Sequence, residues 1–286
     1  MKTARGKRTA LLVAALAVVV VGLLTWRGWP RLRFWWRFES LGPNVWGLAE
    51  YRDRQTRIVF VRVPGGTFLM GAQKTDPEGP NYDPDAYNYD EGPVHEVKLS
   101  PFLIGKCEVS QDQWWVVMGK NPSLFGGDCF PVEMVSWDDC QEFCRKTGLR
   151  LPTEAQWEYA CRAGSKGRFS WGSDYSGGDN FAWHRGNSLG QPQPVGKKRP
   201  NAFGLHDMEG NVWEWCEDVR DAKFFSKPEA GGPDPVASSG AESRVIRGGS
   251  WVEDCRSSCR SAYRAATDDT TAADWLGFRA AYWPLP

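Results

Sequence analysis

Two cysteines near the carboxyl end, Cys255 and Cys259, are the residues of this chain with the most direct chemical potential. Thiolates are soft ligands that suit monovalent copper, and two of them four residues apart could also form a redox pair. They follow an Arg-Gly-Gly-Ser-Trp segment at 247–251, whose paired glycines let another backbone or a ligand approach closely. A cysteine in an exported protein is more often half of a structural disulfide, so both interpretations stay open.

A second group of candidate ligands lies between residues 201 and 215. It gathers four oxygen-bearing side chains, with Gly204 and Gly210 allowing tight turns between them: Asp207, Glu209, Asn211 and Glu214. Oxygen side chains and freed backbone carbonyls are what a hard cation such as calcium needs. A polar turn that satisfies its own backbone explains the same residues equally well, so the residues alone do not decide between the two.

Other catalytic patterns are missing from the sequence. The three histidines His95, His184 and His206 lie far apart and form no zinc motif, so we interpret them as surface or structural residues. No phosphate-binding loop, dinucleotide fingerprint or serine-nucleophile motif occurs. The segment 72–93 carries several acids without the spacing of an EF-hand, so it is predicted to be a solvated loop: Asp83, Asp85, Asp90 and Glu91.

Composition and charge narrow the function class further. With 41% hydrophobic and 13% aromatic residues, the chain can bury a sizeable core. Its 35 basic residues balance its 35 acidic ones, but the first 37 residues hold eight bases and no acid. The remainder therefore has 27 bases against 35 acids, a net charge of −8. Such a body has no basic face for phosphates, so nucleic-acid binding is not expected.

The amino-terminal segment predicts export. Residues 10–24 form an uninterrupted apolar run that follows four basic residues and precedes Trp26 and Arg27. It can be a signal anchor with an aromatic and basic belt, or a cleaved signal peptide, and both place the body outside the cytoplasm, in the periplasm or at the cell surface. We therefore divide the chain into an anchor or signal (1–26), a juxtamembrane connector (27–56) and one domain (57–286). All eight cysteines lie in the exported part, which predicts disulfides.

The elements expected in that domain are short and mixed. Alternating apolar residues predict strands on both sides of a Gly-rich turn at 64–66, and again at 95–99 and 102–109. Helices are expected to begin after Ser110, Ser136 and Thr153, with stops at Gly148 and Gly164. Little periodicity follows until 243, and 244–251 and 277–283 are predicted to be the last strands. The pattern favours an α+β fold with little regular secondary structure.

Seven short segments, taken in order, resemble the formylglycine-generating enzyme, or sulfatase-modifying factor, family. They are residues 63–71, 91–96, 131–137, 150–160, 204–215, 247–251 and 277–279. The resemblance implies a single domain related to the C-type lectin fold. It also implies a chemistry: family enzymes oxidise a cysteine of a sulfatase to formylglycine, using O₂ and a copper(I) ion held by two cysteine thiolates.

This sequence departs from the family at the copper ligands. In the enzymes the two cysteines follow the serine of the Gly-Gly-Ser turn by three and eight residues. Here those positions hold Glu253 and Ser258, while Cys255 and Cys259 follow Ser250 by five and nine. A carboxylate is a poor copper(I) ligand, so the departure puts oxidation in question. If a reaction occurs, Cys255 and Cys259 are its candidate catalytic residues.

The resemblance also assigns a calcium site and a substrate surface. The calcium pattern falls on the side chains of Asp207 and Glu214 and the carbonyls of Gly210 and Val212. A second family calcium site would begin at Asn180, but Pro194 stands where its acid is expected, so only the first is carried over. The expected substrate-contacting residues surround the last Gly-Gly turn: Arg247, Ser250, Trp251, Arg260, Tyr263 and Arg264.

Two functions therefore stay open. The first is an exported, membrane-held family member that recognises a partner polypeptide, such as a sulfatase or another exported enzyme, as a maturation factor or a recognition module. The second is a non-catalytic lectin-fold protein that displays a ligand-binding surface, because related variable proteins end in a similar block. A near-copy of this coding region beside a reverse transcriptase gene would favour the second.

Overall fold

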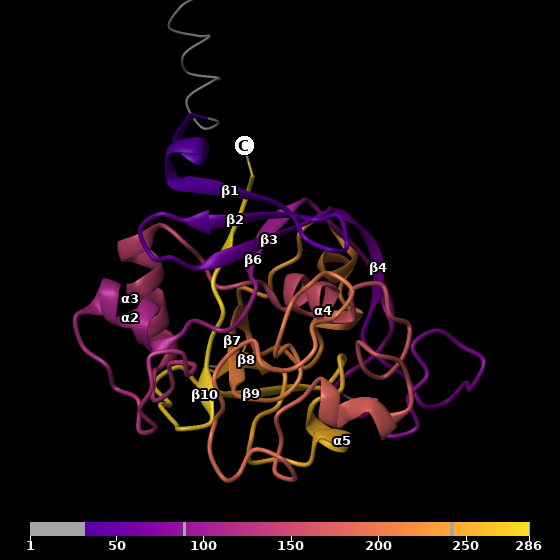
Figure 1. Ribbon diagram of the computed structural model, residues 1–286. Coiled ribbons are helices and arrows are strands. Elements are labelled where there is room, and N and C mark those ends of the chain that lie inside the picture. The colour runs from indigo at the N-terminus through magenta and orange to yellow at the C-terminus, as the bar shows by residue number, and fades with distance from the viewer. Residues whose placement is uncertain (1–31, 88–89, 241–242, 286) are drawn as a thin grey trace, which may run out of the picture. The chain divides into compact units, whose positions relative to one another are not determined.

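The computed structural model describes residues 32–87, 90–240 and 243–285 (Figure 1). The anchor or signal expected at 1–26 lies outside these residues. Within the described ranges, no helix combines the length and the apolar character needed to cross a bilayer. The chain separates into two compact units, and the unit from residue 40 to residue 285 carries the candidate site.

The first sheet has five strands in the order β1-β2-β3-β6-β11. Their bounds are β1 Phe38–Pro43, β2 Ala49–Asp53, β3 Val59–Val63, β6 Phe102–Gly105 and β11 Ala281–Tyr282. The segment predicted at 102–109 is a strand only over β6, and the segment predicted at 277–283 is a strand only at Gly277 and over β11. The segment 27–56, predicted as a connector, contains β1 and β2, so the regular structure begins well before residue 57.

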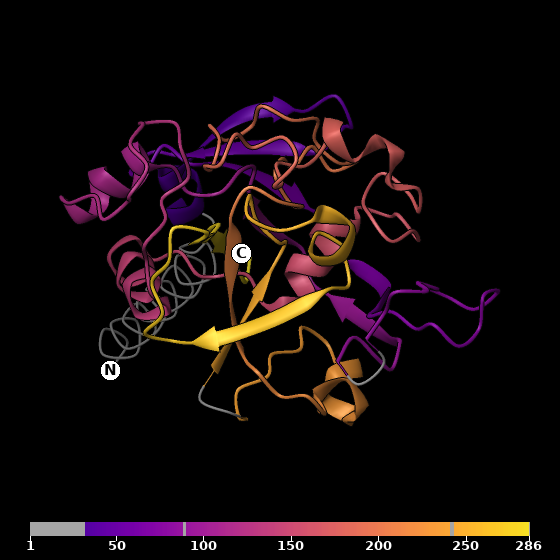
Figure 2. The same cartoon turned by 90° about the horizontal axis from the view of Figure 1, so that it is seen from below.

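The second sheet has the order β10-β7-β8-β9, with β10 parallel to β7 and the other pairs antiparallel. Its strands are β7 Trp213–Val219, β8 Ser243–Arg247, β9 Arg264–Asp268 and β10 Leu276–Gly277. Periodicity did not predict β7, because five of its seven residues are buried and the in–out alternation of a half-exposed strand is missing. Figure 2 shows this sheet from below.

The third sheet is the hairpin of β4 (Gly66–Met70) and β5 (His95–Leu99). The predicted strands on both sides of the 64–66 turn are confirmed as β3 and β4. They do not pair with each other, because β3 lies between β2 and β6 while β4 pairs with β5. The turn therefore moves the chain from one sheet to another.

The helices begin where the sequence predicts. The three longer ones are α2 Gln111–Met118, α3 Trp137–Thr147 and α4 Glu154–Arg162, and Ser110, Ser136 and Thr153 are their N-caps, each in a capping box. Gly148 ends α3 in the left-handed conformation, and at the end of α4 Ala163 adopts it, one residue before the predicted Gly164. Shorter helical segments occur at residues 32–37 and at η1 Tyr175–Asn180, η2 Phe224–Ser226, η3 Pro228–Gly231 and α5 Cys255–Ser258.

One buried cluster joins α4 to all three sheets. The fully buried Trp157 and Cys161 of α4 pack in a cluster with Val61 of β3, Val97 of β5 and Val245 of β8. Trp157 also donates its indole N–H to Glu214 at 2.7 Å. Truncating a tryptophan in such a place typically costs about 3–5 kcal/mol, so this helix fixes how the sheets are arranged.

The structure describes all eight cysteines as free thiols, so it does not show the predicted disulfides. Cys140 and Cys144 lie one turn apart on α3, Cys161 is on α4 and Cys216 on β7. Six of the eight are buried and serve as small apolar residues.

Candidate functional site

The Gly-Gly turn after β8 brings three chain segments together. Gly248 and Gly249 have φ values of 100° and 73°, which other residues rarely adopt. A Cβ on Gly248 would lie 3.2 Å from the carbonyl oxygen of Met208 and from the ring of Trp157. A Cβ on Gly249 would lie 3.1 Å from the sulfur of Cys259. The predicted close approach is real, and the partner is the chain itself.

Cys255 and Cys259, the thiol pair, lie beneath the surface. Both have 0% exposure and pack with Ala182 under the rings of Trp171 and Tyr175. Burial, followed by the hydrogen-bonding contact with Cys255, raises the pKa of the Cys259 thiol well above its usual value. Burial therefore disfavours the thiolate form of Cys259, which is the form that binds copper(I).

Glu253 occupies the position of the first family copper ligand, and both of its carboxylate oxygens accept hydrogen bonds. One of its oxygens accepts hydrogen bonds from the Ser250 backbone N–H at 2.9 Å and from the Ser250 hydroxyl at 2.5 Å. The other accepts the indole N–H of Trp213 at 3.0 Å. A sealed thiol pair beside an occupied carboxylate does not fit a copper centre that a substrate thiol and O₂ must reach.

Two hollows flank α5 above the thiol pair and share Arg256. One has a volume of about 400 Å³ and includes Lys74 and Asp85, and the other has about 470 Å³ and includes Asp179 and Arg185. Their walls carry charges of both signs. The helix thus presents a ridge between two hollows, on the exposed side of the buried sulfurs.

His184 lines the second hollow and confirms its predicted structural role. Its Nε2 lies 2.8 Å from an oxygen of Asp179 and 3.1 Å from the Tyr175 hydroxyl, while its Nδ1 accepts the Gly186 N–H at 3.1 Å. Because Nδ1 is an acceptor, the proton of the neutral ring is on Nε2. The imidazole fixes the wall of the hollow.

Arg247 was expected at the substrate surface but lies in the interior with 0% exposure. Its guanidinium pairs with Glu158 at 2.7 Å and donates to the carbonyls of Ser261 and Ala262 at 2.8 and 2.9 Å. Burial opposes the charge on Glu158, but Arg162 and Arg247 outweigh it and lower its pKa. Arg247 ties β8 to α4 and to the segment after α5, so a structural role replaces the predicted substrate contact.

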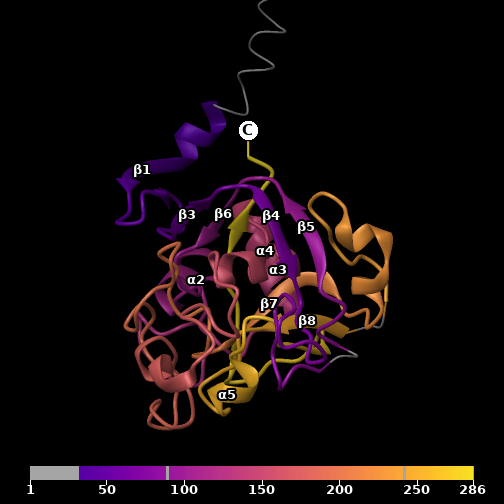
Figure 3. The same ribbon diagram turned by 90° about the vertical axis from the view of Figure 1, so that its right-hand side faces the viewer.

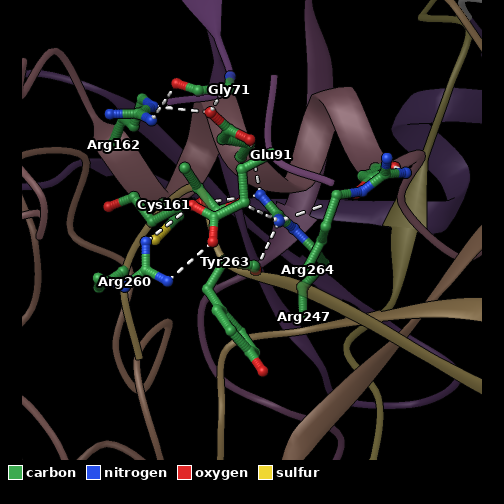
Figure 4. A network of polar contacts seen from close by, with 12 residues as sticks. Gly71, Glu91, Cys161, Arg162, Arg247, Arg260, Tyr263 and Arg264 are labelled. Atoms are coloured by element: carbon green, nitrogen blue, oxygen red, sulfur yellow. Dashed lines mark hydrogen bonds and ion pairs between the residues drawn. The ribbon is translucent and has the colours of Figure 1, made fainter. Parts of the chain in front are cut away.

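Arg260 and Arg264 form similar internal ion pairs (Figure 4). Arg260 binds both Asp83 and Glu91 at 2.7 Å, and Arg264 binds Glu154 at 2.7 Å. All of these side chains are at most 3% exposed. The prediction of a solvated loop at 72–93 is therefore wrong for Asp83 and Glu91, because they neutralise a buried arginine.

The remaining expected contact residues divide by exposure. Ser250 is fully buried by its bonds to Glu253. Trp251 and Tyr263 are partly exposed, with the Trp251 indole N–H donating to the Asp274 carbonyl at 3.1 Å. Of the six predicted substrate residues, these two can contact a partner directly.

Asp207 and Glu214, the two predicted calcium-binding side chains, lie with Glu108 in a buried acidic cluster. Both oxygens of Glu108, and one of Asp207, are buried without a hydrogen-bond partner in the described part of the chain. The other Asp207 oxygen accepts the Gly196 N–H at 2.6 Å. The guanidinium of Arg279 joins the cluster, since it binds Glu214 at 2.6 Å and the carbonyls of Gly105 and Asp207 at 3.0 and 3.2 Å.

The electrostatics of this acidic cluster favour a cation. Burial, followed by repulsion from Asp207, raises the pKa of Glu108 well above its usual value, and burial raises that of Asp207 to about 6. Unpartnered buried oxygens are what calcium coordination would satisfy, so Glu108 and Asp207 fit this ion. Both oxygens of Glu214 are already bonded, to Arg279 and Trp157. In the described residues no group of three or more His, Cys, Asp or Glu side chains has metal-site spacing, so backbone carbonyls would have to complete the ligand set. Glu108 escaped the sequence analysis, and its only signal is an acid three residues after the end of the buried strand β6.

Fold and site together define an α+β protein of the C-type-lectin-related class, with three small sheets around α4 and long loops over a closed thiol pair. The sulfatase-modifying factor enzyme 1-like domain matches residues 46–283, and the chain belongs to this family. It is 32% identical to the formylglycine-generating enzyme of Thermomonospora curvata, over 79% of this chain and 94% of that enzyme. It is 28% identical to the inactive C-alpha-formylglycine-generating enzyme 2 of Bos taurus, over 85% and 93%.

Solved structures agree with this assignment. PvdO from Pseudomonas aeruginosa has a TM-score of 0.69 and 28% identity, covering 81% of this chain and 97% of PvdO. Treponema denticola variable protein 1 has a TM-score of 0.64 and 28% identity, covering 79% and 96%. The predicted family and the C-type-lectin-related α+β fold are thus confirmed.

Proposed function

We propose that this protein is an exported, membrane-anchored member of the family that recognises a partner polypeptide and does not oxidise it. One observation carries the proposal: Cys255 and Cys259 are sealed from solvent while Glu253 occupies the place of the first copper ligand. The family reaction needs a metal that O₂ and a substrate thiol can both reach. Here neither an accessible thiolate nor an open ligand position faces the surface.

The surface above the thiol pair suits recognition. The ridge of α5 carries the exposed Arg256 between two hollows, and Trp251 and Tyr263 are partly exposed nearby in the sequence. Amphipathic aromatic side chains and arginine are the residue types that dominate binding energy at protein interfaces. The partner would be a sulfatase or another exported enzyme, bound as by a maturation factor or a recognition module.

Two further parts of the proposal rest on the sequence and on the acidic cluster. Residues 10–24 supply the anchor, which places the domain in the periplasm or at the cell surface. Calcium binds Asp207 with the carbonyls of Gly210 and Val212, and Glu214 joins them by giving up a bond to Arg279. Glu108 adds a ligand that the sequence did not suggest. The ion stabilises the scaffold and takes no part in a reaction.

A second candidate is a ligand-binding display protein. The similarity to Treponema denticola variable protein 1 favours it, because that protein is named for its variability and covers the same domain. In this case the residues around α5 would differ between near-copies of the gene. A reverse transcriptase gene beside such a copy would support it, whereas a lone gene next to a sulfatase would count against it.

The proposal is tested with the full-length chain purified in detergent. Copper(I) is titrated in competition with a chelator, and a cysteine-containing sulfatase peptide is incubated in air with the loaded protein. We expect no copper site that depends on Cys255 or Cys259, as judged by Cys255→Ser and Cys259→Ser, and no aldehyde in the peptide by mass spectrometry. Aldehyde formation that those substitutions abolish would overturn the proposal.

Recognition itself is tested by photocrosslinking from α5. A photoreactive amino acid replaces Arg256 in the producing cells, and a second copy of the protein carries it at Arg145, an exposed residue of α3. We expect a polypeptide adduct from the first position that is absent from the second. Identical adducts from both would contradict a binding surface at α5.

A further inference from the structure

The outer edge of β4 has backbone groups without partners. In an antiparallel pair, residues alternate between those bonded to the neighbouring strand and those facing away. Lys98 of β5 turns away from β4, since its carbonyl accepts the Asp234 N–H at 2.9 Å. Thr67 is opposite Lys98, so Thr67 and, two residues on, Leu69 direct their backbone groups to the outside of the hairpin.

Only one of these outward groups is bonded. The side-chain amide of Asn81 donates to the Leu69 carbonyl at 2.7 Å and to the Gly71 carbonyl at 2.8 Å. The N–H and C=O of Thr67 and the N–H of Leu69 have no partner in the described parts of the chain. An amide is therefore already bound at one end of this edge, and three further groups are free to bind another backbone.

A large cleft lies along this edge. It has a volume of about 960 Å³ and is lined by Thr67, Phe68 and Leu69 of β4, by the 77–82 loop and by residues 162–166. Figure 3 shows the β4–β5 hairpin beside α4, which contributes Tyr159 to the lining. This volume is at the upper end of the range for ligand pockets.

The floor of the cleft is aromatic. The ring of Tyr159 lies 5.1 Å from that of Phe68 and 5.8 Å from that of Phe203, measured between centroids. The rims carry the exposed Lys166 and Glu78, which have opposite charges. The cleft thus joins an open strand edge to an apolar hollow.

We propose that this cleft binds an extended polypeptide segment, which adds to β4 as a new strand and places one large apolar side chain on the floor. Only an extended backbone offers donors and acceptors in the spacing of Thr67 and Leu69, which is how strand addition gives affinity. A residue opposite Phe68 has its side chain on the same face as that ring, so specificity comes from this one position. The site goes beyond the proposed function, because it uses neither α5 nor the thiol pair.

The test uses capped pentapeptides with Phe fixed at the third position and Thr, Val, Ser or Lys at the others. Binding to the full-length chain is followed by amide hydrogen exchange. We expect exchange at Thr67 and Leu69 to slow at least tenfold, while the ladder-bonded Phe68 amide changes little. The same peptides N-methylated throughout should bind at least tenfold more weakly, since they keep the side chains and lose the donors.

Matched variants separate the edge from the floor. Thr67→Pro removes the free N–H and should abolish binding, whereas Thr67→Ala keeps it and should bind like the wild type. Phe203→Ala should weaken binding about tenfold, and Arg256→Glu should not affect it. Equal binding of the N-methylated peptides, or no protection of Thr67 and Leu69 by any of the peptides, would overturn the proposal. Oligosaccharide binding without that protection would instead assign the cleft to carbohydrate.

Discussion

The acidic cluster and the thiol pair are both buried, yet their polar atoms are in opposite states. Glu108 and Asp207 keep oxygens without hydrogen-bond partners, while around the thiol pair Glu253 has every oxygen bonded and Cys259 is held as a neutral thiol. Unpartnered buried oxygens are costly unless an ion or water completes them. This difference is the basis of our proposal that the chain holds a structural cation at the acidic cluster and no redox metal at the thiol pair.

The largest effect on stability is expected at the ion pairs of Arg260, which hold the segment of the thiol pair in place. Arg260 follows Cys259 directly, and Arg260→Met would leave Glu91 buried without a counter-charge and Asp83 with Arg168 as its remaining partner. Breaking a buried ion pair from one side typically costs about 3–5 kcal/mol. We expect a loss of this size in the free energy of unfolding, measured by urea denaturation.

The matched control for this variant is Arg145→Met, which breaks an exposed pair with Glu142 and should change stability little. If Arg260→Met were equally mild, the closed state of the thiol pair would not depend on its ion pairs.

The second prediction concerns calcium removal. At a free concentration of one hundred times its dissociation constant, a ligand that binds only the native state stabilises it by about 2.7 kcal/mol. For a domain of this size that corresponds to a shift of roughly 5–10 °C in melting temperature. A chelator should therefore lower the melting temperature of the full-length chain, and Glu108→Gln should remove the response.

Glu253→Gln is the control, because it changes a half-buried carboxylate of the thiol region and should leave the calcium response intact. If the chelator left the melting temperature of the wild type unchanged, the acidic cluster would hold no calcium. The main contrast between the acidic cluster and the thiol pair would then be lost.

Local signals predicted the helices well. Capping residues such as Ser136 and Thr153 act over three or four positions, so the starts of α3 and α4 were readable. β7 and β9 were not, because their pairing depends on contacts distant in the sequence. The family assignment came from motifs in a fixed order along the chain. It predicted the fold of the segments in which hydrophobic periodicity gave no prediction.

Prediction of the functional site was limited in the same way, because the burial of a side chain depends on contacts distant in the sequence. Arginines beside a Gly-Gly turn suggest a substrate surface, but whether Arg247 meets solvent or Glu158 depends on where α4 lies. The sequence likewise gave no means to know that Asp83 and Glu91 would return to Arg260 from about 170 residues away. Burial is a property of tertiary packing, and it removed four of the six predicted residues from the surface.

The third prediction uses a buried carboxylate that has its partners. Asp218 accepts the N–H groups of Glu154 and Ala237 at 2.7 and 2.8 Å, and burial raises its pKa to about 7. The native state then holds a proton that the unfolded state has lost between about pH 4 and pH 7. Stability should fall as pH rises through this window, by about 1.4 kcal/mol per unit from this residue.

Asp218→Asn removes this titration, so the difference in unfolding free energy between variant and wild type should change with pH across that window and level off above it. A difference that stays constant from pH 5 to pH 8 would show that the two backbone donors already keep Asp218 ionised, as they would for a carboxylate at the surface.

The smallest effect is expected from restoring the first family ligand. Glu253→Cys puts a thiol three residues after Ser250, but it removes the acceptor of the Ser250 hydroxyl and the Trp213 indole. The lost hydrogen bonds should cost about 1 kcal/mol. Copper(I) affinity should not rise, because Ser258 still occupies the second family position and Cys259 stays sealed and protonated. Glu253→Cys combined with Ser258→Cys recreates the family spacing and is the sharper experiment: if the double variant binds copper(I) and the single one does not, register alone separates this chain from the oxidases. If Glu253→Cys alone already binds copper(I), the thiol pair is accessible to the metal and our interpretation of this region is wrong.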